Sequence, residues 1–318
     1  MSGTMNRLAH LRHPRVRDLA WVMASPSLVD ARHGPWAGRV VDDAWCQIQL
    51  RAHFDWLQAL DRDPQPLLDW LARRPDRRLG PRFEQLVEYW LRHLPQIRFH
   101  GRGIVVGNGE RTLGEFDFLF YDEARRQAIH WEVAVKYYLR HCKADTCRWY
   151  GPNPRDRWDI KIPHLFERQL RLGQRPEARP VLDNAGWCGV QAEALVRGWL
   201  FSPWREDWRH PRPVPAGAAR GHLRGWWIYH EDGLPETAPT ARWRILERLE
   251  WLAPACETDI ARLYSGHDMT ALLAEHFRKN GQGLLLAEMR EGTEAWEEHS
   301  RGFVVARPWP RLGRRKRR

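Results

Sequence analysis

Residues 114–139 read GEFDFLFYDEARRQAIHWEVAVKYYL, two apolar runs separated by a charged segment. Within each run, apolar and polar side chains alternate with the period of two that is typical of β-strands. The pattern predicts a β-hairpin with strands at 113–121 and 128–139 and a turn at 122–127. Both strands also carry acidic side chains among their aromatic ones, and these acids need a physical explanation.

The register of the hairpin places two acids opposite each other. If Tyr121 pairs with Ala128 across the turn, Asp117 faces Glu132, and opposed residues have Cβ atoms about 4.5–5.5 Å apart. Two carboxylates at that separation repel each other unless a cation or a proton lies between them. Lys136 lies four residues beyond Glu132 on the same face, on the order of 13 Å away by strand rise.

A divalent metal ion is a natural occupant of such a pair. Mg²⁺ prefers oxygen ligands and is commonly held by one or two carboxylates together with substrate phosphate. The chemistry implied is metal-assisted hydrolysis of a phosphodiester. The alternative is that Glu115, Asp117, Glu132 and Lys136 form the solvated face of a half-exposed hairpin. His130 lies on the same face, where packing or solvation is the commoner role of a lone histidine.

Helical periodicity dominates the residues before the hairpin. Helices are expected at 13–26, about 42–60, 66–74 and 80–95. In the last of these, Pro81 suits the first turn and Pro95 ends the apolar pattern, and Glu84 lies on the flank of the apolar stripe. A strand at 97–107 and a GNGER turn connect this helix to the hairpin.

Beyond the hairpin, the polar loop WYGPNPRDRW (149–158) precedes an expected helix at 159–172. Later strands are expected at 193–201, 225–230, 283–289 and 301–307, and the proline-rich stretch 205–224 is expected to be a loop or linker. We therefore expect a helical N-terminal region at 1–78, a core at 79–204, a C-terminal α/β extension at 205–310 and a basic disordered tail at 311–318.

Charge and cysteine content bound the class of protein. The net charge is +11, and it falls to +5 (11 − 6) without the six positive charges of the last eight residues, RLGRRKRR. Such a tail either holds polyanions without reading their sequence or is simply solvated. The five cysteines are scattered and odd in number, which favours reduced thiols in a cytoplasm. Cys142, Cys147 and His141 match no usual zinc spacing.

Hydropathy argues against a membrane protein. The mean hydropathy is −0.65, and no apolar run approaches the roughly 18 residues of a membrane helix. The N-terminus lacks the apolar segment of a secretory signal peptide, so none is expected. The nineteen tryptophans are scattered along the chain, which indicates core and interface packing more than one binding surface.

The order of elements resembles the PD-(D/E)XK nuclease superfamily: a helix with an acid, a strand, a strand with Asp, a strand with Glu and Lys, and a helix. A bacterial family of unknown function, domain-of-unknown-function family 1853, is itself grouped with these nucleases. Its resemblance to this chain is carried by LRHPRVRDLAW, LGPRFEQLVEYWL, GEFDFLF, HWEVAVKYYL, WYGPNPRDRWDIKIPHLFERQLRL and WLAP. The resemblance implies a restriction-endonuclease-like α/β (α+β) fold, with a mixed central sheet flanked by helices, and a Mg²⁺ (or Mn²⁺) site.

The resemblance also implies roles for individual residues. Glu84 is the helix acid, Asp117 the principal metal ligand, Glu132 the second ligand and Lys136 the catalytic lysine. The superfamily pattern is acid-x-Lys, whereas here Ala134 occupies the lysine position. Either Lys136 acts from one pleat further along the strand, or the site is degenerate.

Three residues beyond the hairpin are further candidates for contact with substrate. Asp159 and Lys161 could supply a migrated lysine or bind phosphate, and Gln169 could touch the substrate backbone. Ordinary surface or capping roles are the alternative, and Asp159 in particular suits a helix N-cap.

The leading hypothesis is a cytoplasmic Mg²⁺-dependent nuclease that acts on DNA or RNA. One alternative is a catalytically degenerate nucleic-acid-binding protein of the same fold. Another is a protein-interaction scaffold whose tryptophans mark a partner surface.

Overall fold

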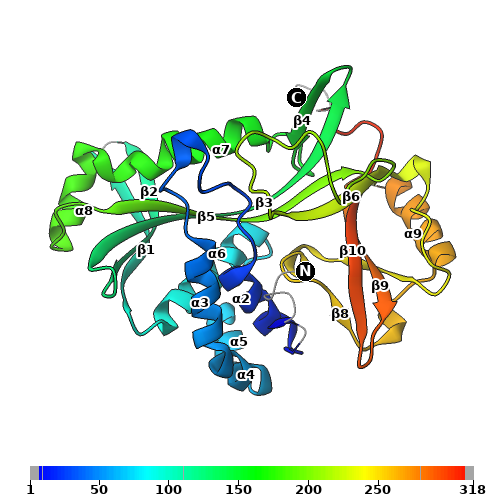
Figure 1. The fold of residues 1–318 in the computed structure, drawn as a ribbon, viewed down its shortest axis with the longest axis horizontal. Helices are drawn as coiled ribbons and strands as arrows, with labels where there is room; N and C mark the ends of the chain where they lie inside the picture. The colour runs from blue at the N-terminus through cyan, green and yellow to red at the C-terminus, as the bar shows by residue number, and fades with distance from the viewer. Residues whose placement is uncertain (1–6, 9, 110, 280, 312–318) are drawn as a thin grey trace. The chain divides into compact units, whose positions relative to one another are not determined.

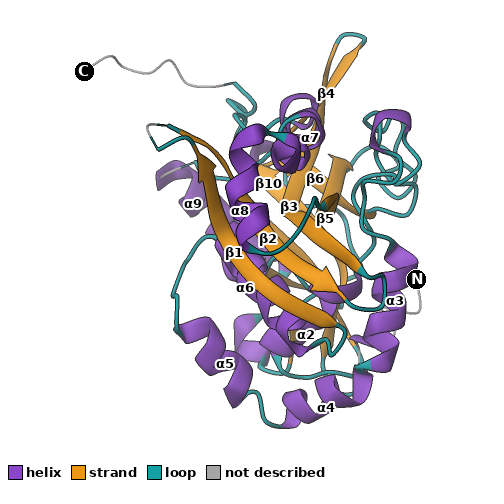
Figure 2. Ribbon diagram, turned by 90° about the vertical axis from the view of Figure 1, so that its left-hand side faces the viewer, coloured by secondary structure: helices purple, strands orange, loops and turns teal. Residues whose placement is uncertain are grey.

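The computed structural model describes residues 7–8, 10–109, 111–279 and 281–311. Within this part of the chain, ten strands form antiparallel and parallel pairs and are accompanied by α-helices (Figures 1 and 2). The mixed α/β class expected from the sequence is confirmed. No helix of the described residues has both the length and the apolar character needed to cross a bilayer.

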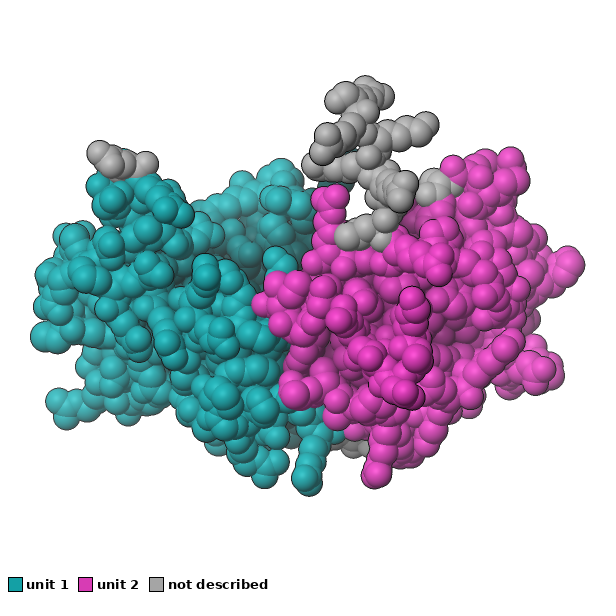
Figure 3. Space-filling model, turned by 90° about the horizontal axis from the view of Figure 1, so that it is seen from above, with its two compact units in different colours: residues 1–135, 161–197, 217–221 teal, residues 136–160, 198–216, 222–318 magenta. Residues whose placement is uncertain are grey.

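The chain divides into two compact units (Figure 3). Unit 1 comprises residues 1–135, 161–197 and 217–221, and unit 2 comprises residues 136–160, 198–216 and 222–318. The four regions expected from the sequence stay a prediction. Most of the expected basic tail, residues 312–318, lies outside the described residues.

The helices before the first described strand belong to unit 1. They are α2 (Pro14–Ala24), α3 (Asp43–Ala52), α4 (Phe54–Arg62), α5 (Gln65–Ala72) and α6 (Leu79–His93). The helix expected at 42–60 is split because His53, with φ −109° and ψ 17°, ends α3 and starts α4. The apolar stripe of α6 is buried as expected, and Trp90 on this stripe packs against Trp45 and Trp131.

The predicted hairpin forms part of an antiparallel meander of β1 (Ile97–Gly107), β2 (Thr112–Asp122) and β3 (Gln127–Lys143). Tyr121 pairs with Ala128, as the sequence predicts, and Leu119 pairs with His130 in the same register. β3 runs from unit 1 into unit 2, where it turns back into β4 (Thr146–Tyr150). β4 was not expected, because the sequence pattern assigned its last residues to a polar loop.

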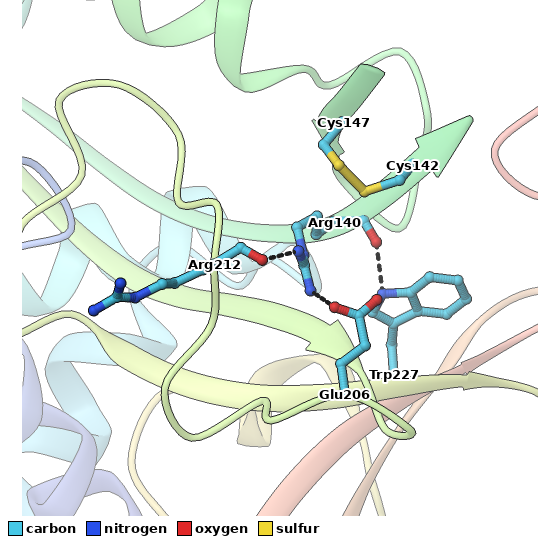
Figure 4. The surroundings of a disulfide bond; sticks show 6 residues. All are labelled: Arg140, Cys142, Cys147, Glu206, Arg212 and Trp227. Atoms are coloured by element: carbon cyan, nitrogen blue, oxygen red, sulfur yellow. Dashed lines mark hydrogen bonds and ion pairs between the residues drawn. A yellow bond between two sulfur atoms is a disulfide. The ribbon is translucent and has the colours of Figure 1, made fainter. Parts of the chain in front are cut away.

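Cys142 and Cys147 form a disulfide across the β3–β4 hairpin (Figure 4). The two residues are direct partners in the β-ladder, with Cα atoms 4.0 Å apart. The expectation of reduced thiols is therefore wrong for this pair, whereas Cys46, Cys188 and Cys256 are free. At the base of the hairpin, the backbone carbonyl of Arg140 accepts a hydrogen bond from Trp227 Nε1, and the Arg140 guanidinium contacts Glu206.

Between β4 and β5 (Gln191–Pro203), the chain forms α7 (Trp158–Glu167), the 3₁₀ turns η2 (Gln169–Gln174) and η3 (Pro176–Ala178), and α8 (Arg179–Asn184). The helix expected at 159–172 is thus shorter. It ends before Arg168, whose φ of −119° departs from helical values. Leu172 and Leu182 then pack against Phe116 and Leu119, and Figure 2 shows α8 lying over β1 and β2.

The strands of unit 2 beyond β5 follow the order β5-β6-β10-β9-β7, with β8 beside β10. They are β6 (Leu223–Tyr229), β7 (Arg242–Leu246), β8 (Cys256–Glu257), β9 (Leu284–Glu291) and β10 (Trp296–Val305), and α9 (Gly266–Lys279) accompanies them. The sequence pattern finds β6, β9 and β10. It misses β7, β8 and α9, although Trp243 of β7 and three residues of α9 join the core around Trp226: Met269, Leu273 and Phe277.

Gly302 on β10 lets the Trp226 indole lie against the strand. A Cβ atom at position 302 would come within 2.0 Å of two ring carbons of Trp226. The indole has little freedom to move, because it is fully buried and its Nε1 donates to Ser300 Oγ at 2.9 Å. We expect Gly302→Ala to lower the free energy of unfolding by about 2 kcal/mol, a typical cost of overpacking a core.

A urea titration of the Gly302→Ala protein checks this expectation, as a lower midpoint at unchanged m-value. Gly221→Ala is the matched control, because a Cβ atom at position 221 meets no atom within 4 Å. Equal midpoints for the two variants would contradict the tight approach of Trp226 to β10.

Candidate functional site

Four acidic side chains gather in unit 1 on three elements of the expected core. Glu84 lies on α6, Glu115 and Asp117 on β2, and Glu132 on β3. Their charges act on one another, because Glu84, Glu115 and Glu132 each raise the pKa of Asp117. This concentration of negative charge stands out in a chain whose net charge is +11.

Asp117 is held by the backbone of the neighbouring strand. The β2–β3 ladder runs as far as Phe118 and Trp131, and beyond it Asp117 Oδ2 accepts the backbone N–H of Val133 at 2.9 Å. A side-chain contact thus replaces the next rung of the ladder, where the sequence predicted that Asp117 would lie directly opposite Glu132. The two carboxylates still adjoin, since the charge of Glu132 raises the pKa of Asp117.

Glu132 is fully buried, and other side chains contact both of its carboxylate oxygens. Oε1 lies 2.8 Å from His130 Nε2, and Oε2 accepts a hydrogen bond from Gln169 Nε2 at 2.6 Å. Burial lowers the pKa of His130 to about 3, so its imidazole is neutral and donates the Nε2–H. His130 and Gln169 therefore fix the orientation of the carboxylate without neutralising its charge.

Both carboxylates of the pair resist ionisation. Burial raises the pKa of Asp117 from 3.8 to about 8, and the nearby charge of Glu132 adds to the rise. Burial is also the main cause that raises the pKa of Glu132 from 4.5 to about 8. Within the described chain, neither carboxylate forms an ion pair with an arginine or a lysine. At neutral pH the pair therefore retains a proton unless another cation replaces it.

Glu84 lies at the edge of this site and has a cationic neighbour. Its Oε2 is 3.4 Å from Arg102 Nη2, and Arg102 on β1 also pairs with Glu88 at 3.3 Å. Burial raises the pKa of Glu84, while the Arg102 charge opposes the rise. The acid expected from the helix is thus beside the pair but is bound to an arginine.

The expected catalytic lysine has a different partner. Lys136 belongs to unit 2, where its Nζ lies 3.1 Å from Asp156 Oδ2. Tyr138 donates a hydrogen bond to the other oxygen of Asp156, at 3.1 Å. The structure therefore gives Lys136 a defined ion pair within unit 2.

The other candidate residues beyond β3 differ in their contacts. Asp159 pairs with Arg157 and lies in the first turn of α7, two residues after the N-cap position expected for it from the sequence. Lys161 is exposed on α7 and belongs to unit 1. Only Gln169 of this group contacts the acid pair.

The acid pair fits a divalent cation as part of its ligand set. Asp117 and Glu132 offer carboxylate oxygens, which are the ligands that Mg²⁺ and Mn²⁺ prefer. No cluster of three or more His, Cys, Asp or Glu side chains in the described ranges has the arrangement of a complete metal site. The pair therefore suits an ion whose remaining ligands are water and substrate oxygens.

Sequence reasoning missed three contributors to this site. His130 was assigned to packing or solvation, although its spacing of two residues from Glu132 places both side chains on one strand face. Arg102 gave no signal, because the chain has 51 basic residues and none is distinguished by local pattern. The backbone N–H of Val133 is free to donate to Asp117 only because the β2–β3 ladder ends before it, and the residue types of the two strands do not indicate where the ladder ends.

Comparison with known proteins identifies a family and nothing more specific. The family described as Domain of unknown function (DUF1853) matches residues 17–305, most of the chain. The chain belongs to this family, as the sequence stretches quoted above indicated. Neither a curated protein nor a solved structure matches it.

Proposed function

We propose that this DUF1853 protein is a metal-dependent nuclease with a restriction-endonuclease-like core, in which Asp117 and Glu132 hold Mg²⁺ or Mn²⁺. The observation that carries the proposal is the adjacent, largely buried carboxylate pair, which no lysine or arginine of the described residues neutralises. Burying two like charges costs several kcal/mol unless a cation or a proton compensates. Binding of a divalent ion explains why the chain would keep so unfavourable a pair.

The surrounding residues would give the carboxylates fixed positions. The Val133 N–H holds Asp117, while His130 and Gln169 hold the two oxygens of Glu132. A divalent ion at such a pair polarises a phosphodiester oxygen and lowers the pKa of an attacking water. The order of α6, β1, β2 and β3, with acids on three of them, supports the likeness to PD-(D/E)XK nucleases.

A second candidate function is nucleic-acid binding without cleavage. It is favoured by the Lys136–Asp156 ion pair and by Ala134 at the position where the superfamily carries its lysine. Lys161, which was suggested above as a migrated catalytic lysine, belongs to the same unit as the acids and is the lysine that the nuclease would need in place of Lys136. The third hypothesis, a scaffold with a tryptophan surface, stays a prediction, and no tryptophan is among the exposed large hydrophobic side chains of the described residues.

A cleavage assay tests the proposed function. Supercoiled plasmid, single-stranded DNA and RNA are each incubated with the purified protein in Mg²⁺, in Mn²⁺ or in EDTA. We expect strand breaks in at least one substrate with either metal and none with EDTA. Binding without breakage in both metals would instead support the non-catalytic function, and absence of binding would contradict both.

A further inference from the structure

A hollow of about 450 Å³ in unit 1 is lined by arginines from two distant parts of the chain. Arg168 and Arg171 come from the end of α7 and from η2, and Arg39 follows the short 3₁₀ turn η1 (Gly34–Trp36). Glu167 is the carboxylate in the lining, so three positive charges face one negative charge. No ion pair joins Arg39, Arg168 or Arg171 to a carboxylate of the described residues.

Arg39 is held in place by its backbone but has an unsatisfied side chain. Its N–H donates to the Trp36 carbonyl at 3.0 Å, and its carbonyl accepts from the Ala194 N–H at 2.9 Å. Its Nη2 atom is buried and has no hydrogen-bond partner among the described residues. Burial and the charge of Arg171 both lower the pKa of Arg39, which shows that the two arginines are close enough to repel each other.

One wall of the hollow is rigid and aromatic. Trp36 stacks on Phe166 with ring centroids 4.6 Å apart and planes 9° from parallel. The Cζ3 and Cη2 atoms of Trp36 lie against Gly217, where a Cβ atom would come within 2.0 Å of the indole. Both rings are buried, so they shape the hollow but leave no free face on which a base could stack. The lining therefore suits an anion better than a nucleobase.

We propose that this hollow binds a backbone phosphate of a nucleic acid strand whose adjoining phosphodiester lies at the acid pair. The proposal rests on the proposed function, and η2 connects the two sites. Gln169 at the start of η2 donates to Glu132, while the neighbouring Arg168 and Arg171 line the hollow. Guanidinium groups match phosphate oxygens with two parallel hydrogen bonds, and a phosphate would relieve the repulsion between Arg39 and Arg171.

The polar lining continues on the other side of Arg39. This residue also borders a second hollow of about 250 Å³, together with Gln174 and Gln191. Arg39 thus borders both hollows, and each hollow is also lined by residues of η2. A nucleic acid strand that crosses η2 would need such a continuous polar surface.

Binding of a fluorescent single-stranded oligonucleotide in EDTA tests this inference without cleavage. The variant is Arg168→Gln/Arg171→Gln, and the matched control is Arg51→Gln/Arg62→Gln, which removes two exposed arginines on α3 and α4. Each lost phosphate contact lowers the slope of log K against log salt by about 0.7 for a single strand. Because both arginines serve one phosphate, we expect the variant to lose about 0.7 in slope and roughly 5-fold in affinity at 0.1 M NaCl, with the control unchanged.

The outcomes separate this inference from the proposed function. If the slope of log K against log salt is the same for variant and control, the phosphate site is overturned, even if the wild-type protein cleaves nucleic acid when Mg²⁺ or Mn²⁺ is present. The expected loss of slope from a wild-type protein that never cleaves overturns the nuclease and keeps the phosphate site. Inorganic phosphate, a mononucleotide and polyglutamate serve as competitors, each at a phosphate or carboxylate concentration equal to the phosphate concentration of the oligonucleotide. If any of them displaces the oligonucleotide, the site does not prefer a nucleic acid strand, and this part of the inference is overturned. Circular dichroism spectra identical to wild type confirm that the variants are folded.

Discussion

An Asp117→Asn protein is expected to lose at least about 100-fold in metal-dependent cleavage rate and yet to be more stable than the wild type. The amide keeps an oxygen that accepts the Val133 N–H, as Asp117 Oδ2 does at 2.9 Å. It removes one charge from the pair and offers an N–H to Glu132. Since a raised carboxylate pKa reports an unfavourable charge, we expect about 2 kcal/mol of added stability at pH 8.

The opposite signs of the two effects make this test informative, because an unfolded variant cannot explain lost activity together with gained stability. Cleavage rates and urea midpoints at pH 8 are the measurements. Glu193→Gln is the matched control, because Glu193 is also buried but pairs with Arg125 and accepts the Trp131 Nε1–H at 3.0 Å. Its loss is expected to destabilise the protein. Undiminished cleavage by Asp117→Asn would refute the metal site.

In EDTA, the free energy of unfolding is expected to fall by roughly 4 kcal/mol between pH 5 and pH 8. This value assumes that the pair in the folded protein holds one proton more than it does in the unfolded chain over this range. The pKa values of Asp117 and Glu132 rise from 3.8 and 4.5 in the unfolded chain to about 8 in the folded protein. Between these values the folded state binds more protons than the unfolded state. Stability is therefore highest at the acidic end of the window and is lost as pH rises toward 8.

Urea titrations at pH 5, 6, 7 and 8 measure this slope, and the Asp117→Asn/Glu132→Gln protein removes the contribution of the pair. Mn²⁺ at 100 times its dissociation constant is expected to restore about 2.7 kcal/mol at pH 8. The gain is expected to shrink toward pH 5, because protons compete with the ion for the carboxylates. If the free energy of unfolding changes with pH equally in the wild type and the double variant, the carboxylate pair is ionised in the folded protein without cost to stability.

The hairpin illustrates what local sequence determines. Alternating side chains and the length of the turn were sufficient to predict the pairing of Tyr121 with Ala128 and the proximity of Asp117 to Glu132. The partner of Lys136 was beyond this reasoning, because Asp156 lies 20 residues away in an irregular loop. Arg102 and Gln169 reach the acids from a different strand and a different turn, so their roles depend on tertiary packing.

The missed elements have a related cause. β4 is five residues long and is defined by its pairing with β3, a pairing that also brings Cys142 to Cys147. Counting cysteines along the sequence gives no access to that pairing. β7 has only five residues, and two of them are arginines. One of these, Arg244, is buried and pairs with Glu250 and Glu257, which the short local pattern does not reveal.

The interleaving of the two units limits how the protein can be taken apart. Each unit is assembled from three stretches of chain, and each strand of the pair β3 and β5 contributes residues to both. A recombinant fragment that stops at residue 135 would contain Asp117 and Glu132 but would lack Arg168, Gln169, Arg171 and all of β5. No single truncation yields either unit whole, so enzymology and crystallisation should begin from the intact polypeptide.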